Sequence, residues 1–318
     1  MKDKIFSALR VFVSVGLLGL LFWIKRSELG DISQIITSCN WAFVLIAGGF
    51  IAINITFLSY RLKVIFTGEN INVSLKESVQ YTLVGYFFNN FMPTAVGGDI
   101  VKAHYVGKFS KKKIESYASV LMDRLIGLYS FLVVAAIALL FDKGRLEVDG
   151  IKPIVFSLVF IGMVGFVVIT NKKVLLFFEK ILMRFKMMSI GEKISGIYRI
   201  VHDYRNRKDV VLKSFIISVI AQCAYFSVIY MFFRSLGVDV HFGNVFLIMP
   251  VVTFISMMPS IGGLGVREWA IVAFFSQVAG KETAFSASIL VLFGIMSISI
   301  VGGLVYLWWG FTGIRDKK

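Results

Sequence analysis

Long runs of apolar positions, separated by short basic or mixed-charge segments, dominate the pattern of this chain. Six of these runs approach or exceed the roughly 20 residues that a helix needs to cross the hydrocarbon core of a bilayer. They cover about 9–24, 41–60, 116–141, 153–170, 214–233 and 283–311. The pattern therefore predicts an all-α protein, a polytopic helical membrane protein with about six full transmembrane helices.

Two further apolar stretches, about 79–101 and 245–266, are interrupted in their middles by proline and glycine. Proline removes a backbone donor and glycine relaxes the backbone, so an unbroken helix is not expected through either stretch. Broken backbone at membrane depth is tolerated only where protein buries it or where it lines a wet cavity. We therefore expect two re-entrant hairpins in addition to the six spans.

The composition agrees with a membrane protein. Of the 318 residues 57% are hydrophobic and only 17% are charged, whereas soluble domains carry roughly 25% charged residues. The net charge is +15, but the basic residues flank the apolar runs. They therefore indicate membrane orientation and attraction to anionic lipid, and no nucleic-acid partner is expected. In residues 171–213, apolar positions on one helical face and basic positions off it predict an amphipathic segment at the cytoplasmic membrane surface.

The distribution of Lys and Arg predicts the orientation. With the N-terminus in the cytoplasm, 25 of the 34 basic residues fall on the cytoplasmic side and 8 on the other side. Positive residues favour the cytoplasmic side, so a multi-pass protein of the cell (inner) membrane is expected, with both termini in the cytoplasm. In this arrangement the first hairpin enters from the cytoplasm and the second enters from the opposite side.

The two interrupted stretches resemble each other. Residues 92–99 (MPTAVGGD) match residues 258–265 (MPSIGGLG), and residues 118–121 (ASVL) match residues 287–290 (ASIL), at offsets of 166 and 169. The opposite sidedness of the stretches indicates an inverted pseudo-repeat, about 41–141 and 214–311, within one integral membrane domain, 1–318. Transporters place substrate sites where such repeats meet. The alternative is chance recurrence of short motifs in an apolar chain.

The motifs offer a binding site for an anion. Gly97 and Gly98 precede a predicted helix at Asp99, and free amides at a helix start attract phosphate. The alternative is that these glycines only allow close helix packing. The candidate residues for a lipid headgroup are Asn90, Gly97, Gly98, Asp99, Lys102, Asp123, Arg124, Gly262, Gly263, Arg267 and Glu268.

A polar stripe follows helical spacing through the third span. It consists of Ser116, Ser119, Asp123, Gly127 and Ser130. A buried carboxylate in a membrane needs a partner or a wet path. We expect Asp123 to pair with Lys102 or Arg267, and Arg124 to pair with Asp99 or Glu268, either in a binding site or as purely structural ion pairs.

At these residues the chain resembles the lysylphosphatidylglycerol synthase transmembrane region family, also described as flippase-like. The matching elements are Asn90, Pro93, Gly97–Asp99, Ala118–Val120, Asp123–Gly127 and Pro259–Glu268. The resemblance covers essentially the whole chain. Relatives include the membrane half of the bacterial multiple peptide resistance factor and proteins described as archaeal dolichol-linked glycosyltransferases. Lys102 stands where many relatives are expected to have Arg, a change that loosens bidentate contact with phosphate.

The resemblance implies a flippase-like transporter that moves a membrane phospholipid or a polyprenyl-linked lipid between leaflets. A separate synthase or glycosyltransferase is a possible partner, since the chain shows no counterpart of a soluble aminoacyl-transferase domain. No catalytic residue, metal or cofactor is expected. Two alternatives stay open: a membrane glycosyl- or aminoacyl-transferase subunit, and an ion-coupled solute transporter that uses Asp99, Asp123 or Glu268 as proton carriers.

Overall fold

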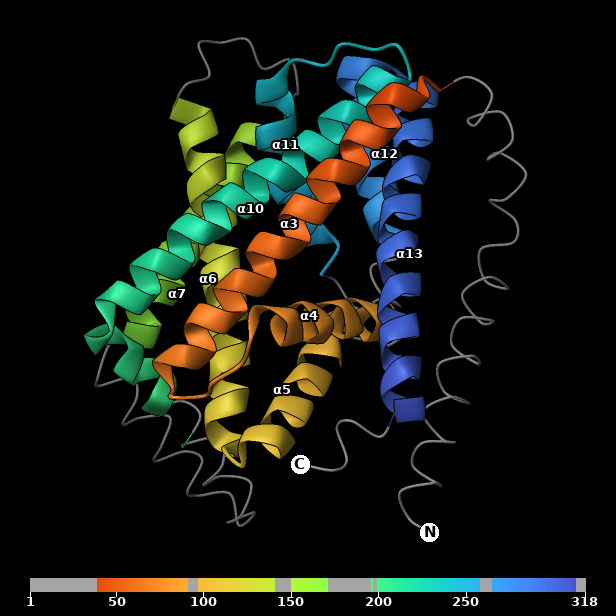
Figure 1. The fold of residues 1–318 in the computed structure, drawn as a ribbon. Coiled ribbons are helices and arrows are strands. Elements are labelled where there is room, and N and C mark those ends of the chain that lie inside the picture. The colour runs from red at the N-terminus through yellow and green to blue at the C-terminus, as the bar shows by residue number, and fades with distance from the viewer. Residues whose placement is uncertain are drawn as a thin grey trace.

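The regular elements of the protein are helices wherever the structure, a computed structural model, describes the chain. The described residues are 39–90, 97–140, 150–170, 196, 199–257 and 265–312. The helices are α3 (Trp41–Gly68), α4 (Leu75–Asn89), α5 (Gly97–Ser110), α6 (Lys113–Leu140), α7 (Ile151–Thr170), the 3₁₀ turn η1 (Tyr204–Asn206), α10 (Lys208–Ser235), α11 (Phe242–Ile255), α12 (Val266–Ala279) and α13 (Lys281–Thr312) (Figure 1). The predicted all-α class is confirmed for this part of the chain.

Four of the described helices, α3, α6, α10 and α13, are long and apolar enough to cross a membrane. A helix of 28 residues, such as α3, is about 42 Å long at the usual rise per residue and exceeds a hydrocarbon core of about 30 Å. These helices coincide with the predicted spans 41–60, 116–141, 214–233 and 283–311. The chain is therefore a membrane protein with several apolar helices. The helix α7 occupies the predicted span 153–170, and the predicted span 9–24 lies outside the described residues, so the count of six stays a prediction.

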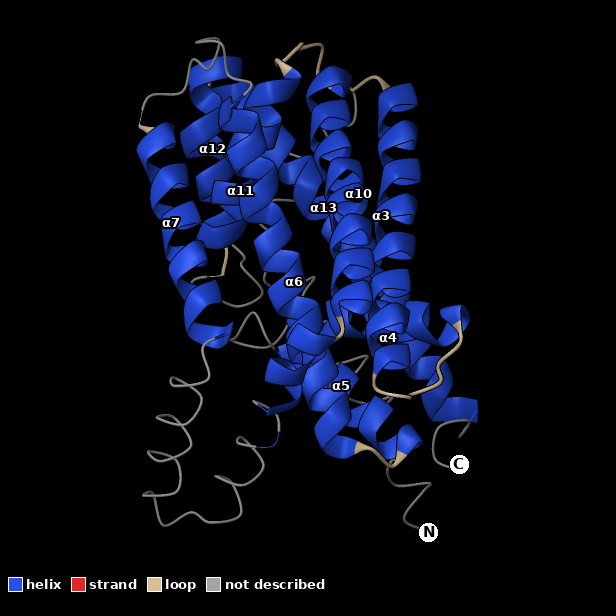
Figure 2. Ribbon diagram, turned by 90° about the vertical axis from the view of Figure 1, so that its left-hand side faces the viewer, coloured by secondary structure: helices blue, strands red, loops and turns tan. Residues whose placement is uncertain are grey.

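Each of the two interrupted stretches contains a pair of short helices. The helix α4 ends at Asn89 and α5 begins at Gly97, while α11 ends at Ile255 and α12 begins at Val266. The α4–α5 pair and the α11–α12 pair lie toward opposite ends of the long helices in both views (Figures 1 and 2). That each pair dips into the bilayer from its own leaflet stays a prediction, as does the inverted repeat. The predicted basic segment 171–213 lies mostly outside the described residues.

Local sequence explains where the helices α4 and α12 begin. The hydroxyl of Ser74 accepts a hydrogen bond from the Glu77 amide, and the Glu77 carboxylate accepts one from the Ser74 amide, which is a complete capping box. At α12, Gly265 has a φ of 80°, a conformation that glycine adopts without strain. Its amide donates to the Glu268 carboxylate at 2.6 Å.

Three clusters of buried apolar side chains hold the described helices together, the smallest around Ile65, Ile126 and Tyr204. The largest core gathers α10, α11, α12 and α13 around side chains such as Phe233 and Phe275. The second core is rich in aromatic side chains and joins α4 and α5 to α13 through Phe88, Tyr105 and Tyr306. Aromatic pairs in edge-on contact contribute about 0.5–1.5 kcal/mol each beyond their burial. The short helices are thus anchored against long ones.

Candidate functional site

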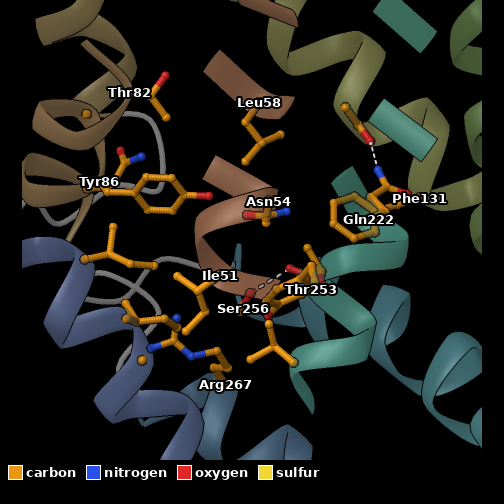
Figure 3. A pocket seen from close by; sticks show the side chains of 18 of the residues that line it. Ile51, Asn54, Leu58, Thr82, Tyr86, Phe131, Gln222, Thr253, Ser256 and Arg267 are labelled. Carbon is orange, nitrogen blue, oxygen red and sulfur yellow. Dashed lines mark hydrogen bonds between the residues drawn. The ribbon is translucent and has the colours of Figure 1, made fainter. Parts of the chain in front are cut away.

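A polar cavity of about 320 Å³ lies at the centre of the helix bundle. Every described long or short helix except α7 contributes to its wall (Figure 3). The side chains with polar atoms are Asn54, Arg61, Thr82, Tyr86, Asn89, Asn90, Asp99, Lys102, Asp123, Arg124, Gln222, Tyr225, Thr253, Ser256 and Arg267. A cavity of this size falls at the lower end of the range for small-molecule sites, about 300–1,000 Å³.

Six of the candidate residues from the sequence lie together in this wall. They are Asn90, Asp99, Lys102, Asp123, Arg124 and Arg267. Gly97, Gly98 and Glu268 are neighbours of these residues in the chain but do not line the cavity. Gly262 and Gly263 lie outside the described residues. The structure thus brings residues from α5, α6, α12 and the C-terminal end of α4 to one place.

Asp99 is the centre of a three-residue ion cluster. Its Oδ1 lies 2.7 Å from the Lys102 ammonium, one turn along α5, and its Oδ2 lies 3.2 Å from the Arg124 guanidinium on α6. The expected pairing of Arg124 with Asp99 is confirmed. Asp99 and Lys102 are both buried. A buried carboxylate with two cationic partners is well compensated, and it ties α5 to α6.

The expected pairing of Asp123 with Lys102 or Arg267 is wrong, because Asp123 pairs with Arg61. The Nε of Arg61 donates to Oδ1 of Asp123 at 2.7 Å, and the Nη1 of Arg61 donates to the Ser218 hydroxyl at 2.9 Å. Arg61 has room because Gly127 faces it, where a Cβ would lie only 3.1 Å from Nη1. Lys102 instead pairs with Asp99, which lies on the same helix, α5.

Arg61 lines the cavity but is not among the candidate residues that the sequence indicates. The apolar run ends at Tyr60, which placed Arg61 at the end of a span, but α3 continues to Gly68 and carries Arg61 into the bundle. Its side chain is only 8% exposed. The signal in the sequence is the spacing of two polar residues, Asn54 and Arg61. Seven residues, or about two helical turns, separate them, so they lie on one face of α3.

Gly98, near the start of α5, serves packing. A Cβ at Gly98 would overlap the carbonyl oxygen of Gly85 on α4, so this position requires glycine. The Gly98 amide donates to Oδ1 of Asn89 at 2.7 Å. The amide that was expected to attract an anion therefore already has an acceptor. Asn90 donates to the hydroxyl of Ser299 on α13, so both asparagines satisfy protein groups.

Arg267 differs from the other cations in the wall. Its side chain projects from the start of α12 into the cavity, on the side of Ile51 and Ser256 (Figure 3). Its only ion pair within the described residues is with the neighbouring Glu268, at 3.3 Å. The side chain is 10% exposed, yet its Nε has no hydrogen-bond partner in the described part of the chain. A buried N–H donor without an acceptor costs about 1–3 kcal/mol, which a ligand acceptor would recover.

A second unsatisfied group lies on α10. The amide nitrogen of Gln222 donates to the Gly127 carbonyl at 3.0 Å and to the Ser130 hydroxyl, so its amide orientation is fixed. The oxygen Oε1 of Gln222 is buried and has no donor among the described residues. Asn54 donates to the Ala221 carbonyl at 2.7 Å, joining α3 to α10. One orphan donor and one orphan acceptor thus belong to residues that line the cavity.

The charges of the wall favour an anion. Four cationic side chains line the cavity, namely those of Arg61, Lys102, Arg124 and Arg267, against the two carboxylates of Asp99 and Asp123. A wall with excess positive charge in surroundings of low polarity attracts a negatively charged group. Within the described ranges, no group of three or more His, Cys, Asp or Glu side chains is placed to hold a metal ion.

Comparison with known proteins finds one family of membrane proteins and two similar membrane proteins. The family model described as "Lysylphosphatidylglycerol synthase TM region" matches residues 7–305. A UPF0104 membrane protein of Pyrococcus horikoshii is 26% identical over an alignment that covers 94% of this chain and 96% of the relative. A UPF0104 membrane protein of Methanothermobacter thermautotrophicus is 22% identical, with 92% of each chain covered.

Proposed function

Because the chain belongs to the lysylphosphatidylglycerol synthase TM region family, we propose that its polar cavity binds the anionic headgroup of a membrane lipid and passes it between leaflets. The observation that carries this proposal is Arg267. It is a buried guanidinium, aimed into a cavity with excess positive charge, whose Nε has no partner in the described residues. A phosphate oxygen is the acceptor that fits, since Arg–phosphate hydrogen bonds are charge-assisted.

The other cations support this function without being free ligands. Lys102 and Arg124 share the carboxylate of Asp99, and Arg61 is paired with Asp123. Their ion pairs fix the wall and leave its overall charge positive. A headgroup with a phosphate at Arg267 would also bring hydroxyl or ammonium donors within the same cavity as the orphan oxygen of Gln222. Glycerol, ethanolamine and sugar headgroups all carry such donors.

The position of the cavity supports movement across the membrane. Its wall includes the α4–α5 pair and the α11–α12 pair, which lie toward opposite ends of the long helices (Figures 1 and 2). A site between two such helix pairs is reachable from each side in turn when one pair moves against the other. We place the protein in the cell membrane, with both termini in the cytoplasm, from the excess of Lys and Arg on that side.

The ligand class is a phospholipid or a polyprenyl-linked lipid with a negatively charged phosphate. In this account a separate synthase or glycosyltransferase makes or consumes the lipid. The two buried carboxylates of the wall do not favour the alternative of proton-coupled solute transport, because Asp99 and Asp123 both hold ion-pair partners.

The test is lipid movement by the purified chain in liposomes. Vesicles contain fluorescent phosphatidylglycerol, and a membrane-impermeant reductant destroys the fluorescence of the outer leaflet only. With the protein present, we expect a faster loss of the protected inner-leaflet signal than in empty vesicles. A matched set with fluorescent phosphatidylcholine, which has no net charge, measures headgroup selectivity. If no anionic lipid, including a polyprenyl phosphate, moves faster than in empty vesicles, the proposal is wrong.

A further inference from the structure

A second cavity, of about 490 Å³, runs along the outside of the bundle between α3 and α13. Residues of both helices line it, among them Trp41, Val44, Gly48, Phe293, Ser297 and Val301. We call it the α3–α13 groove. Its wall contains no charged side chain. Several of its apolar side chains are exposed, including Trp41 at 52% and Val301 at 47%. In a membrane, a surface of this kind contacts hydrocarbon.

The α3–α13 groove and the polar cavity share part of their walls. Ile51, Phe232, Gly294 and Ile298 line both. Gly294 lies at the boundary, where a Cβ would come within 3.3 Å of Ile51 Cδ1. The two spaces are therefore neighbours, separated by a thin layer of side chains. Gly294 contributes no side chain to this layer.

The difference in lining gives the pair an amphipathic character. The polar cavity carries four cationic side chains and two carboxylates, while the α3–α13 groove carries none. A free phosphate or a soluble metabolite needs only the first space. A lipid has an anionic part and an apolar part that are covalently joined, and these would occupy adjacent spaces of opposite polarity.

We propose that the α3–α13 groove holds a hydrocarbon chain of the same lipid whose headgroup enters the polar cavity. This inference rests on the proposed function and narrows it, because it makes the ligand a whole lipid and sets the path of its chain. The shared wall supports this occupant, because Ile51 and Gly294 border both spaces, so a headgroup beside them lies next to the groove that would hold its chain. The competing occupant is the chain's own predicted span, 9–24.

Two neighbouring glycines of α3 provide a matched pair of variants. Gly48 and Gly49 are both exposed, and a Cβ at either one would meet no atom within 4 Å. Only Gly48 lines the α3–α13 groove. Gly48→Leu therefore fills the groove, whereas Gly49→Leu adds the same side chain one residue away. Both replace glycine by a better helix former, so the effect on α3 itself is equal. Both proteins must show the same thermal unfolding midpoint before they are compared.

The experiment is photo-crosslinking from inside the groove. The full chain, with benzoylphenylalanine in place of Val44, is reconstituted in nanodiscs of phosphatidylcholine with a minor share of phosphatidylglycerol, and adducts are identified by mass spectrometry. We expect phosphatidylglycerol adducts enriched over its share of the bilayer by about tenfold, a ratio within reach of charge-assisted hydrogen bonds at the headgroup. The enrichment should be lost in Gly48→Leu, retained in Gly49→Leu, and lost in Arg267→Gln.

Three outcomes would overturn the inference. Adducts that follow the bulk composition of the bilayer would show ordinary surrounding lipid. Adducts to residues 9–24 would show that the chain covers its own groove. Equal enrichment in Gly48→Leu and Gly49→Leu would place the bound chain elsewhere. Liposomes separate this failure from that of the proposed function: phosphatidylglycerol movement by the same wild-type protein, without groove enrichment, leaves the function standing and removes only the inference.

Discussion

The two sides of the polar cavity treat their charged groups differently. On one side, formed by α3, α5 and α6, each charge has a partner: Arg61 binds Asp123, and Asp99 binds both Lys102 and Arg124. We call this the paired side. On the other side, at the start of α12, Arg267 has only the adjacent Glu268, and its Nε has no acceptor in the described chain.

This contrast separates stability from binding. Removing one member of a buried ion pair leaves an uncompensated charge, so the paired side should respond to substitution by losing stability. Replacing Arg267 removes an unsatisfied Nε from the protein and an interaction from the ligand, while the Glu268 carboxylate keeps the Gly265 amide as a donor. The α12 side should therefore respond by losing binding. The predictions below test this division, beginning with the largest effect.

Asp123→Asn should destabilise the protein by about 3–5 kcal/mol, because it leaves the Arg61 guanidinium buried without its carboxylate. Denaturant or thermal unfolding in detergent measures the change. The double variant Arg61→Met with Asp123→Leu is the control and should recover most of the stability. If Asp123→Asn unfolds at the wild-type midpoint, the paired side is not the scaffold that we describe.

Gly98→Ala should destabilise the protein by about 3 kcal/mol, the upper part of the usual range for an overpacked site, because its Cβ would overlap the Gly85 carbonyl. The obstacle is backbone, so α4 and α5 must separate. Gly49→Ala is the matched control, since a Cβ there meets nothing within 4 Å. Equal unfolding midpoints for the two variants would contradict the close approach of α4 and α5.

Arg267→Gln should reduce phosphatidylglycerol movement in liposomes by at least about tenfold, the loss expected for charge-assisted hydrogen bonds worth about 1.5–3 kcal/mol. Its unfolding midpoint should stay at or above that of the wild type. Arg267→Lys keeps the charge but not the planar fork and should fall between the two. If Arg267→Gln lowers the unfolding midpoint but moves lipid at the wild-type rate, Arg267 contributes to stability and not to binding, which contradicts the division between the two sides.

Ser74→Ala should have the smallest effect, a loss of about 1 kcal/mol of stability, because it removes the hydroxyl that caps α4. Ser74→Asp keeps an acceptor at the cap and should retain most of the stability. Lipid movement per folded molecule should be unchanged in both, as the capping box lies apart from the cavity wall. A drop in transport with stability intact would extend the binding site to the start of α4.

Much of the architecture follows from sequence, because long apolar runs predict long helices and proline and glycine predict the interruptions. The polar stripe of α6 was also predictable: Ser116, Ser119, Asp123 and Ser130 are all buried. Helical spacing is a local property, and it places such residues on one face without knowledge of the partner helix.

The pairing of charges was not predictable in full. Arg124 and Asp99 were expected to pair and do so, but the partner of Asp123 comes from α3, whose length depends on tertiary packing beyond the apolar run. Sequence also left two roles open for Gly98, since glycine serves both anion binding and close packing. The structure shows close packing, with the amide already bonded to Asn89. Orphan atoms such as Arg267 Nε are visible only in three dimensions.

The most direct test of the central claim is electron microscopy of the wild-type protein in phosphatidylglycerol nanodiscs, with a bound antibody fragment to aid alignment. The account predicts density for a phosphate within hydrogen-bonding distance, about 2.7–3.2 Å, of the Arg267 guanidinium inside the polar cavity. Lipid density confined to the outer surface of the bundle, with Arg267 bound to a protein acceptor instead, would contradict it.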